Sequence, residues 1–377
     1  MQRTHRISRR QFVRVGSIGV GVLGAEVGAH DAQPLRPEPS GRPSHLLDRE
    51  WMRRATPAEL AEKLDRGPDI NAHDDRLQTP LHHAARCSPD PEVVALLLDR
   101  GADINARDDR GRSPLHHAVR GNADPEIVAL LLDRGADINA RDDRRRSPLH
   151  HAARCDIVEM VALLLDRGAA IDARDDRRRT PLLCADRHPD SEGGVLALLI
   201  DRGADINARD DRGMTALFRA ASRNRTATLE DLMDRGADVL ARDECGGTAL
   251  HAAASHPRCV ALLIREGADV NARNNRGVTP LHLAAELAAA CPLDQEIPPL
   301  LLDHGAQIDA LDEQGRPPLH WAARVCWSDD GGLELLLLRG ADASLRDATG
   351  STPADLVGAD ECRAEIKRRL RAAANRR

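Results

Sequence analysis

The chain has 377 residues, a formal net charge of −6 and 30% charged residues. Tyrosine is absent and aromatic residues make up 1% of the sequence, so any core must be built mainly from Leu, Ile, Val and Ala. The modest negative charge argues against general affinity for nucleic acid, and the scarcity of aromatic rings removes the platforms on which unpaired bases stack.

The amino-terminal segment, residues 1–32, is predicted to be a signal peptide. Residues 8–14 read Ser-Arg-Arg-Gln-Phe-Val-Arg and resemble a bacterial twin-arginine (Tat) export signal, and a mild apolar stretch follows at residues 15–29. That stretch has fewer than about 18 apolar residues and is interrupted by Glu26, so we expect no stable membrane span. The resemblance implies an exported, periplasmic or cell-envelope protein, or a cytoplasmic one if the signal does not function.

Two further features precede the predicted folded body. Residues 19–24 match the dinucleotide-binding fingerprint Gly-x-Gly-x-x-Gly, but no strand-helix-strand pattern surrounds them, and we interpret the match as chance. Residues 33–50 begin with a proline-rich stretch among polar neighbours, which predicts an extended linker. The folded domain is therefore expected at residues 51–377.

One motif then recurs nine times. A Gly-Ala-Asp-like segment is followed, always twelve residues later, by a Thr-Pro-Leu-His-like segment, whereas the distance onward to the next Gly varies between 19 and 26 residues. A constant half and a variable half are typical of a solenoid whose neighbouring units contact each other through the constant element. The pairs are Gly67 and Thr79, Gly101 and Ser113, Gly135 and Ser147, Gly168 and Thr180, Gly203 and Thr215, Gly236 and Thr248, Gly267 and Thr279, Gly305 and Pro317, and Gly340 and Thr352.

Each unit contains two predicted helix starts. In the unit that begins at Ser113, this residue is a good helix cap and a proline follows at the first helical position; Asp124 and its following proline repeat the arrangement. Residues 127–132 give the second helix a broad apolar face, and Gly135 supplies a left-handed stop. Residues 135–143 are predicted to be extended and to form a protruding finger. The variable spacing places insertions between the two helices, the longest at residues 286–299.

These motifs resemble the ankyrin repeat, whose pattern combines a Thr-Pro-Leu-His helix start, a Leu-Leu helix end and a Gly-Ala-Asp-Val-Asn-Ala finger. The resemblance covers about residues 56–375. It implies an all-α repeat solenoid, a stack of helix-turn-helix units with β-hairpin fingers. We expect an amino-terminal cap at residues 51–78 that opens with a capping box at Thr56, eight full repeats at about residues 79–351, and a carboxy-terminal cap at residues 352–377.

Histidine recurs three residues after six of the helix starts. The resemblance implies that this histidine ties the finger backbone to the helix, a tie that should be missing where Leu183 and Phe218 replace it. A second histidine follows in three consecutive units, but layers about 10 Å apart exceed the reach of shared metal ligands near 2 Å. We therefore predict no metal and no cofactor. The first set is His82, His116, His150, His251, His282 and His320, and the second is His83, His117 and His151.

The eight cysteines do not follow the repeat. Cys87 and Cys155 occupy equivalent sites two layers apart, which is too far for a disulfide. Cys291 could pair with Cys259 or with Cys326 only if the long loop folds back. We expect most of the cysteines to be small buried residues.

Arginines gather at three adjacent predicted finger tips. Most fingers have glycine two residues before the Thr, but Leu77, Arg145 and Arg178 depart from this rule. If the turn demands a positive φ there, each arginine costs about 1 kcal/mol. A partner with an acidic surface is one explanation, and a solvated charged rim, partly neutralised by neighbouring aspartates, is the other. The predicted partner-binding residues are Arg110, Arg112, Arg144, Arg145, Arg146, Arg177, Arg178 and Arg179.

No catalytic constellation or phosphate-binding loop is identifiable among the repeating residues. We therefore predict a monomeric, non-enzymatic scaffold for protein-protein interaction, binding a protein partner through the finger tips and the concave helix face, and no nucleic acid. The alternatives are an ankyrin-containing effector or enzyme accessory protein, and a structural protein without a specific ligand.

Overall fold

The structure is a computed structural model that describes residues 45–121, 124–185, 194–290, 296–325, 331–358 and 361–375. The chain divides into two units, residues 1–42 and 43–377, and all described residues belong to the second. The predicted signal peptide and most of the predicted linker lie outside the described residues.

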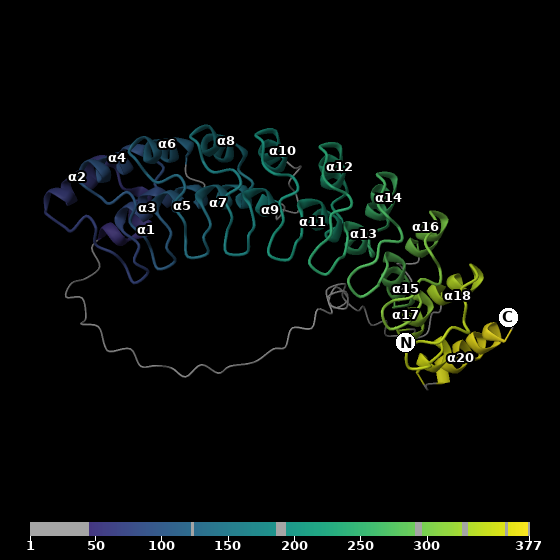
Figure 1. Cartoon of the computed structure of the whole chain (residues 1–377). Helices are drawn as coiled ribbons and strands as arrows, with labels where there is room; N and C mark the ends of the chain where they lie inside the picture. Colours follow the sequence, from purple (N-terminus) through teal and green to yellow (C-terminus); the bar gives the residue numbers. More distant parts are fainter. Residues whose placement is uncertain are drawn as a thin grey trace, which may run out of the picture. The chain divides into compact units, whose positions relative to one another are not determined.

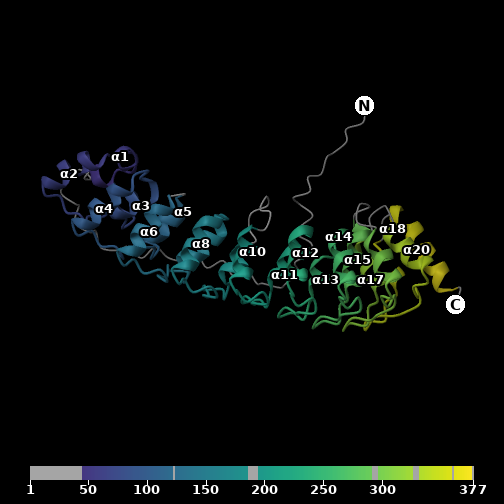
Figure 2. The same cartoon turned by 90° about the horizontal axis from the view of Figure 1, so that it is seen from above.

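Helices of the second unit form two rows, and each inner helix is followed by an outer helix and then by a protruding loop (Figures 1 and 2). Most neighbouring inner helices pack on one another, as do most neighbouring outer helices. The inner row contains α1 (Arg49–Arg54), α3 (Pro80–Cys87), α5 (Pro114–Arg120), α7 (Pro148–Cys155), α9 (Pro181–Ala185), α11 (Ala216–Ser222), α13 (Ala249–Ala252), α15 (Pro280–Ala290), α17 (Pro318–Val325) and α19 (Pro353–Leu356). The outer row contains α2 (Pro57–Asp65), α4 (Pro91–Asp99), α6 (Pro125–Asp133), α8 (Val158–Asp166), α10 (Gly194–Asp201), α12 (Thr226–Asp234), α14 (Pro257–Arg265), α16 (Ile297–Asp303), α18 (Gly331–Leu338) and α20 (Glu361–Ala374). A short 3-10 helix, η2 (His45–Leu47), precedes α1.

The predicted helix boundaries are confirmed where they depend on local signals. Ser113 is the N-cap of α5 and Asp124 is the N-cap of α6, each followed by proline at the first helical position. Thr56 and Glu59 form the predicted capping box of α2, with the Glu59 carboxylate 3.0 Å from the Thr56 amide. Gly135 has φ 91°, and an added Cβ would meet no atom within 4 Å, so this position needs glycine for its conformation and not for space.

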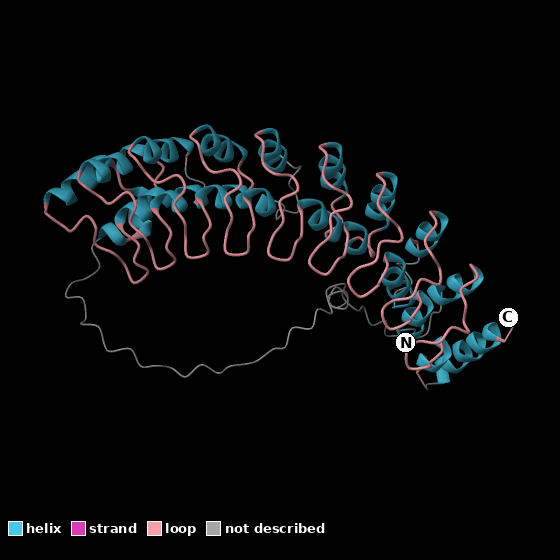
Figure 3. Cartoon of the chain, in the orientation of Figure 1, coloured by secondary structure: helices cyan, strands magenta, loops and turns pink. Residues whose placement is uncertain are grey.

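The fingers correct one expectation. Within the described residues they contain no β-strand, as Figure 3 shows, although the predicted hairpin turn is present. The finger before Ser113 is closed by the Asp108 amide donating to the Arg112 carbonyl at 3.0 Å, and the Asp109 amide donates to the preceding finger at the Arg76 carbonyl at 2.8 Å. Single bonds of this kind close a turn but do not extend into a ladder.

Three helical elements differ from the expected pattern. Helix α1 was not expected, and it begins two residues before the end of the predicted linker; it is capped by Asp48 and held by Met52, which is fully buried. The first part of the long insertion continues α15 to Ala290, because its Ala-rich sequence favours helix. The carboxy-terminal cap, expected at residues 352–377, contains two helices, α19 and α20, of which α20 buries Ile366 and Leu370.

The core is one continuous cluster that extends from Leu46 to Leu370. Each repeat contributes a few small aliphatic side chains, for example Leu115, Val128 and Leu131, which are fully buried between adjacent layers. No single repeat encloses its own apolar residues, so the stack as a whole supplies the stability. Among the described residues, no helix combines the length and the apolar character that a membrane crossing requires.

Candidate functional site

The recurring histidine connects one repeat to the next. Nδ1 of His82 accepts the Thr79 backbone N–H at 3.1 Å, and Nε2 of the same ring donates to the Arg112 carbonyl at 3.0 Å. Because an amide N–H can only donate and a carbonyl can only accept, the ring must be neutral with its hydrogen on Nε2. The predicted tie between finger and helix is confirmed, and the finger it reaches belongs to the following repeat. His116, His150, His251 and His282 repeat this geometry.

The exceptions follow from the sequence. Leu183 and Phe218 have no ring nitrogen at this position, so two successive junctions lack the tie, as predicted. His320 keeps the outward bond, to the Ser351 carbonyl at 3.0 Å, but its buried Nδ1 has no partner because Pro317 has no N–H to donate.

Burial lowers the pKa of the tie histidines. The pKa of His116 falls from 6.5 to about 4, mainly through burial and in spite of the bond to the Arg146 carbonyl, which favours the charged ring. The pKa of His282 also falls to about 4 for the same reason. These rings therefore stay neutral in the folded protein at pH values where a free histidine would be charged.

The second histidines bind aspartates at the base of the fingers. His117 donates from Nε2 to Asp108 at 2.9 Å, and the same carboxylate oxygen receives the Arg112 guanidinium at 2.6 Å. The other oxygen of Asp108 accepts the backbone N–H groups of Arg110 and Arg112 at 2.9 and 2.8 Å. His151 and Asp142 repeat the arrangement with Arg146, whereas His83 and Asp74 form the same pair without an arginine, because Gln78 occupies that position.

Both partners in this buried cluster titrate abnormally. Burial by itself would raise the pKa of the Asp108 carboxyl, but the hydrogen bonds from His117 and Arg112 outweigh it and hold that pKa well below its usual range. Burial lowers the pKa of His117 to about 4, although its bond to Asp108 opposes the shift. The cluster therefore consists of an ionised carboxylate, a charged arginine and a neutral histidine. Across the part of the chain that the structure describes, no group of three His, Cys, Asp or Glu side chains is placed to hold a metal ion.

Three of the eight predicted partner-binding arginines are used inside their own fingers. Arg112, Arg146 and Arg179 immediately precede a helix cap and form ion pairs of 2.6 to 2.8 Å with the aspartate four residues earlier. Their side chains are only 6%, 15% and 17% exposed. They stabilise the turn and offer little surface to a partner.

The other five, Arg110, Arg144, Arg145, Arg177 and Arg178, are exposed. Backbone bonds between adjacent fingers keep them in register, since the Asp143 amide donates to the Arg110 carbonyl at 3.0 Å and the Asp176 amide donates to the Arg144 carbonyl at 2.9 Å. We call this edge of exposed finger residues the finger rim. It also contains three exposed arginines in the register of Arg110 that the sequence analysis missed, Arg76, Arg212 and Arg276. The neighbouring aspartates expected at the tips are exposed one position earlier, at Asp75, Asp109, Asp143, Asp176 and Asp211.

A further set of finger arginines joins neighbouring fingers. Arg107 donates to the Arg141 carbonyl at 2.9 Å, and Arg141 in turn donates to the Arg174 carbonyl at 2.6 Å. These residues recur six positions before the helix cap, which was a readable signal in the sequence. The rim is thus a linked edge and not a row of independent loops.

Backbone strain at the rim is confirmed. Arg145 and Arg178 have φ 56° and Leu77 has φ 55°, the left-handed conformation that the glycine rule predicted. Leu77 shows that a residue other than glycine at this position need not be basic.

The double variant Arg145→Gly, Arg178→Gly is expected to be more stable than wild type by about 1 kcal/mol per site, because glycine adopts a positive φ without steric penalty. The free energy of unfolding from urea titration would measure the gain. Arg144→Gly is the matched control, since Arg144 is exposed but does not have a positive φ, and it should give no gain. A loss of stability in the double variant would contradict the strain argument.

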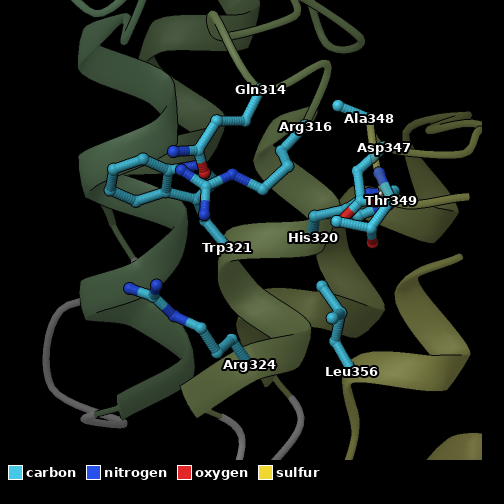
Figure 4. Close-up of a pocket in the computed structure, with 9 residues that line it drawn as sticks. All are labelled: Gln314, Arg316, His320, Trp321, Arg324, Asp347, Ala348, Thr349 and Leu356. Atoms are coloured by element: carbon cyan, nitrogen blue, oxygen red, sulfur yellow. Dashed lines mark hydrogen bonds between the residues drawn. The ribbon is translucent and has the colours of Figure 1, made fainter. Parts of the chain in front are cut away.

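One pocket of about 280 Å³ lies between the last two fingers (Figure 4). In that view the Arg316 side chain extends to Trp321 on one side, and Asp347 and Thr349 lie on the other side. The Trp321 indole donates to Asp312 at 3.0 Å, and Arg316 lies over its ring and pairs with the same carboxylate. The two arginines at the pocket are therefore already paired, Arg316 with Asp312 and Arg324 with Glu286.

The cysteines follow the prediction only in part. Cys184 and Cys259 are buried, Cys87 is partly buried, and Cys155 and Cys245 are exposed; all five are free thiols. The proposed disulfide partners Cys291 and Cys326 lie outside the described residues.

Comparison with known proteins places these observations in a family. A model of ankyrin repeats in three copies matches residues 53–142, 123–210 and 217–291, a model of many ankyrin repeats matches residues 194–232, and a single ankyrin repeat matches residues 314–348. Among solved structures, the chain is similar to the ankyrin repeat domain of Bcl-3, titled a unique member of the IkappaB protein family, with 30% identity over 55% of this chain and 94% of that chain and a TM-score of 0.49. The search of curated proteins gave no significant match. The chain belongs to the ankyrin repeat family.

Proposed function

We propose that this chain is a monomeric, non-enzymatic scaffold that binds a protein partner through the finger rim and the adjoining face of the inner helices. Ankyrin repeats are generally protein-protein interaction modules. One observation supports the assignment to the rim: backbone hydrogen bonds fix the exposed arginines of adjacent fingers in register. For example, the Asp176 amide donates to the Arg144 carbonyl at 2.9 Å. A surface that is ordered before binding loses little conformational entropy when a partner docks.

The charge pattern of the rim favours a protein partner over nucleic acid. Exposed arginines alternate with exposed aspartates, for example Asp143 beside Arg144 and Asp176 beside Arg177. A uniformly charged phosphate backbone would meet repulsion at every aspartate, whereas a protein surface can present both signs in a matching pattern. Export by the Tat pathway stays a prediction from residues 8–14, which lie outside the described residues.

The test compares two full-length variants of equal charge. In the rim variant, Arg144, Arg145, Arg177 and Arg178 are replaced with Ser; in the control, Ser replaces four outer-row arginines, Arg100, Arg134, Arg167 and Arg202. The control residues form exposed ion pairs of 2.6 to 2.9 Å, which contribute little to stability. Each immobilised protein is exposed to extract from the source organism, and bound proteins are quantified by mass spectrometry. A protein retained by wild type and control but reduced at least tenfold on the rim variant supports the proposal. Equal retention on all three would exclude the rim.

A further inference from the structure

Three arginines occupy the same position on successive inner helices. Arg86, Arg120 and Arg154 lie on α3, α5 and α7, each seven residues after its helix cap. The layers are tightly packed at this point, because a Cβ added to Gly121 would lie 2.1 Å from the Arg86 carbonyl oxygen. The backbones of α3 and α5 therefore approach each other closely here, and the three arginines lie in consecutive layers. We call this set the arginine ladder.

None of the three has an acidic partner within 4.0 Å among the described residues, whereas arginines of the fingers and the outer row do. Arg86 is partly buried, and its Nε has no hydrogen-bond partner. The buried finger carboxylate Asp108 is already bound to another arginine and a histidine. A guanidinium that is partly removed from water without a partner is unfavourable, as for Arg86, while Arg120 and Arg154 are exposed and open to a ligand.

In a later pair of repeats, the position equivalent to the arginine ladder has the acidic partner that the ladder lacks. On α15 and α17 this position holds Glu286 and Arg324, and the two side chains pair across the layers at 2.8 Å. Side chains at this position can therefore reach their counterparts in the next repeat. On α3, α5 and α7 the same arrangement brings like charges together, and the pKa of Arg120 is lowered by burial and by Arg112, Arg86 and Arg154.

Taking the scaffold function proposed above as its basis, we infer that the arginine ladder binds an extended acidic segment of the partner protein, with one carboxylate of the segment pairing with the arginine of each repeat. Arginine forms bidentate hydrogen bonds with carboxylates, which fixes the orientation of the segment. Packed helices lie roughly 10 Å apart. A chain in the extended polyproline II conformation has three residues per turn and rises about 3.1 Å per residue, so every third side chain lies on the same face, about 9 Å from the one before. We therefore expect an acidic residue at every third position of the segment.

The segment is polypeptide and not nucleic acid. A nucleic acid strand carries one phosphate about every 3.4 Å, far denser than one charge per repeat. Its surplus charges would face the exposed aspartates of the nearby finger rim, such as Asp109 and Asp143. The chain also carries a net charge of −6, which disfavours a uniform polyanion.

The test measures the binding of a fluorescein-labelled peptide to the full-length protein by fluorescence anisotropy. The probe peptide has Glu at every third position separated by Gly and Ser, and a control peptide has the same composition with its Glu residues contiguous. The ladder variant combines Arg86→Gln, Arg120→Gln and Arg154→Gln. A charge-matched variant combines Arg100→Gln, Arg134→Gln and Arg167→Gln on the outer row, and thermal melting by circular dichroism verifies that both variants fold.

We expect wild type to bind the spaced peptide at least tenfold more tightly than the contiguous one, with affinity falling as salt is raised. The ladder variant should lose at least tenfold in affinity, and the charge-matched variant less than threefold. No binding to wild type at millimolar peptide, equal affinity for both peptides, or equal losses in both variants would overturn the inference. Tighter binding of a DNA oligonucleotide than of the spaced peptide would overturn it in favour of nucleic acid.

The two proposals can fail separately. If the peptide results are negative while the rim variant still loses its captured protein, the scaffold function stands and the ladder has no such role. If the peptide results are as expected while capture is equal on all immobilised proteins, the rim assignment fails and the ladder remains a binding surface.

Discussion

Asp108→Asn is expected to lower the free energy of unfolding by about 3–5 kcal/mol, the range observed when one member of a buried ion pair is removed. Asparagine keeps the side-chain oxygen that accepts the backbone N–H groups of Arg110 and Arg112, so the turn itself survives. The loss comes from the charged Arg112 and from His117, whose donors would both face a neutral amide in a site that is closed to water. Urea denaturation followed by circular dichroism would measure it.

Another repeat of the chain provides the matched control. In the finger before Thr279, the three equivalent positions hold Asn274, Val278 and Leu283, and the Asn274 side chain accepts the Arg276 and Val278 amides at 2.9 and 3.0 Å. That repeat folds in the same way without charge at these positions.

The triple variant Asp108→Asn, Arg112→Val, His117→Leu should therefore recover most of the stability that the single variant loses, because no buried charge is left unpaired. A single variant within 1 kcal/mol of wild type would show that Arg112 and His117 find other partners. A triple variant as unstable as the single one would show that the site depends on its shape and not on charge pairing.

Acidification from pH 6.5 to pH 4 is expected to destabilise the protein steeply. The pKa values of His116, His117 and His282 are each lowered from 6.5 to about 4 by burial. In this window the unfolded chain binds protons that the folded protein does not, so the stabilising contribution present above pH 6.5 is lost as pH falls. A shift of this size corresponds to roughly 3 kcal/mol per histidine. The Asp108 carboxylate, whose pKa is lowered, stays ionised in the folded protein over the same window.

Urea midpoints at pH 7, 6, 5 and 4.5 would measure the effect. His116→Leu is the matched control, because Leu183 occupies the equivalent position in another repeat. This variant should be less stable than wild type at pH 7, since the bonds to Ser113 and Arg146 are lost, but its stability should fall less steeply with acid. Stability that is unchanged between pH 7 and pH 5 would contradict the prediction.

Much of the fold was predictable because its signals are local. The Ser-Pro pair at Ser113 and the Asp-Pro pair at Asp124 each cap a helix, and Gly135 ends one by its own conformation. Helix α1 was missed because its stability comes from burying Met52 against the rest of the stack, a contact that no local pattern reveals. The strands expected in the fingers did not form because each finger makes too few backbone bonds to its neighbours.

The candidate site was predictable only in part, for a geometric reason. The left-handed turn at Arg145 followed from the glycine rule. Which arginines of a finger face water did not, because this depends on side-chain directions within the turn: Arg112 points back to Asp108, whereas Arg110 points outward. The arginine ladder was readable as a recurrence seven residues after each cap, but its significance appears only beside the Glu286 and Arg324 pair.

The missing histidine ties have a mechanical consequence. Because Leu183 and Phe218 replace the histidine, two successive helix-to-finger ties are absent in the middle of the array. The arginine bonds between neighbouring fingers continue there, from Arg174 to the Arg209 carbonyl at 3.4 Å and from Arg209 to the Arg242 carbonyl. Where neighbouring fingers stay bonded but the histidine ties to the helices are absent, the stack resists bending less than elsewhere. We therefore expect the stack to bend most easily at α9 and α11. The arginine-rich repeats and the later repeats can change their relative tilt there while the bonds between fingers are kept.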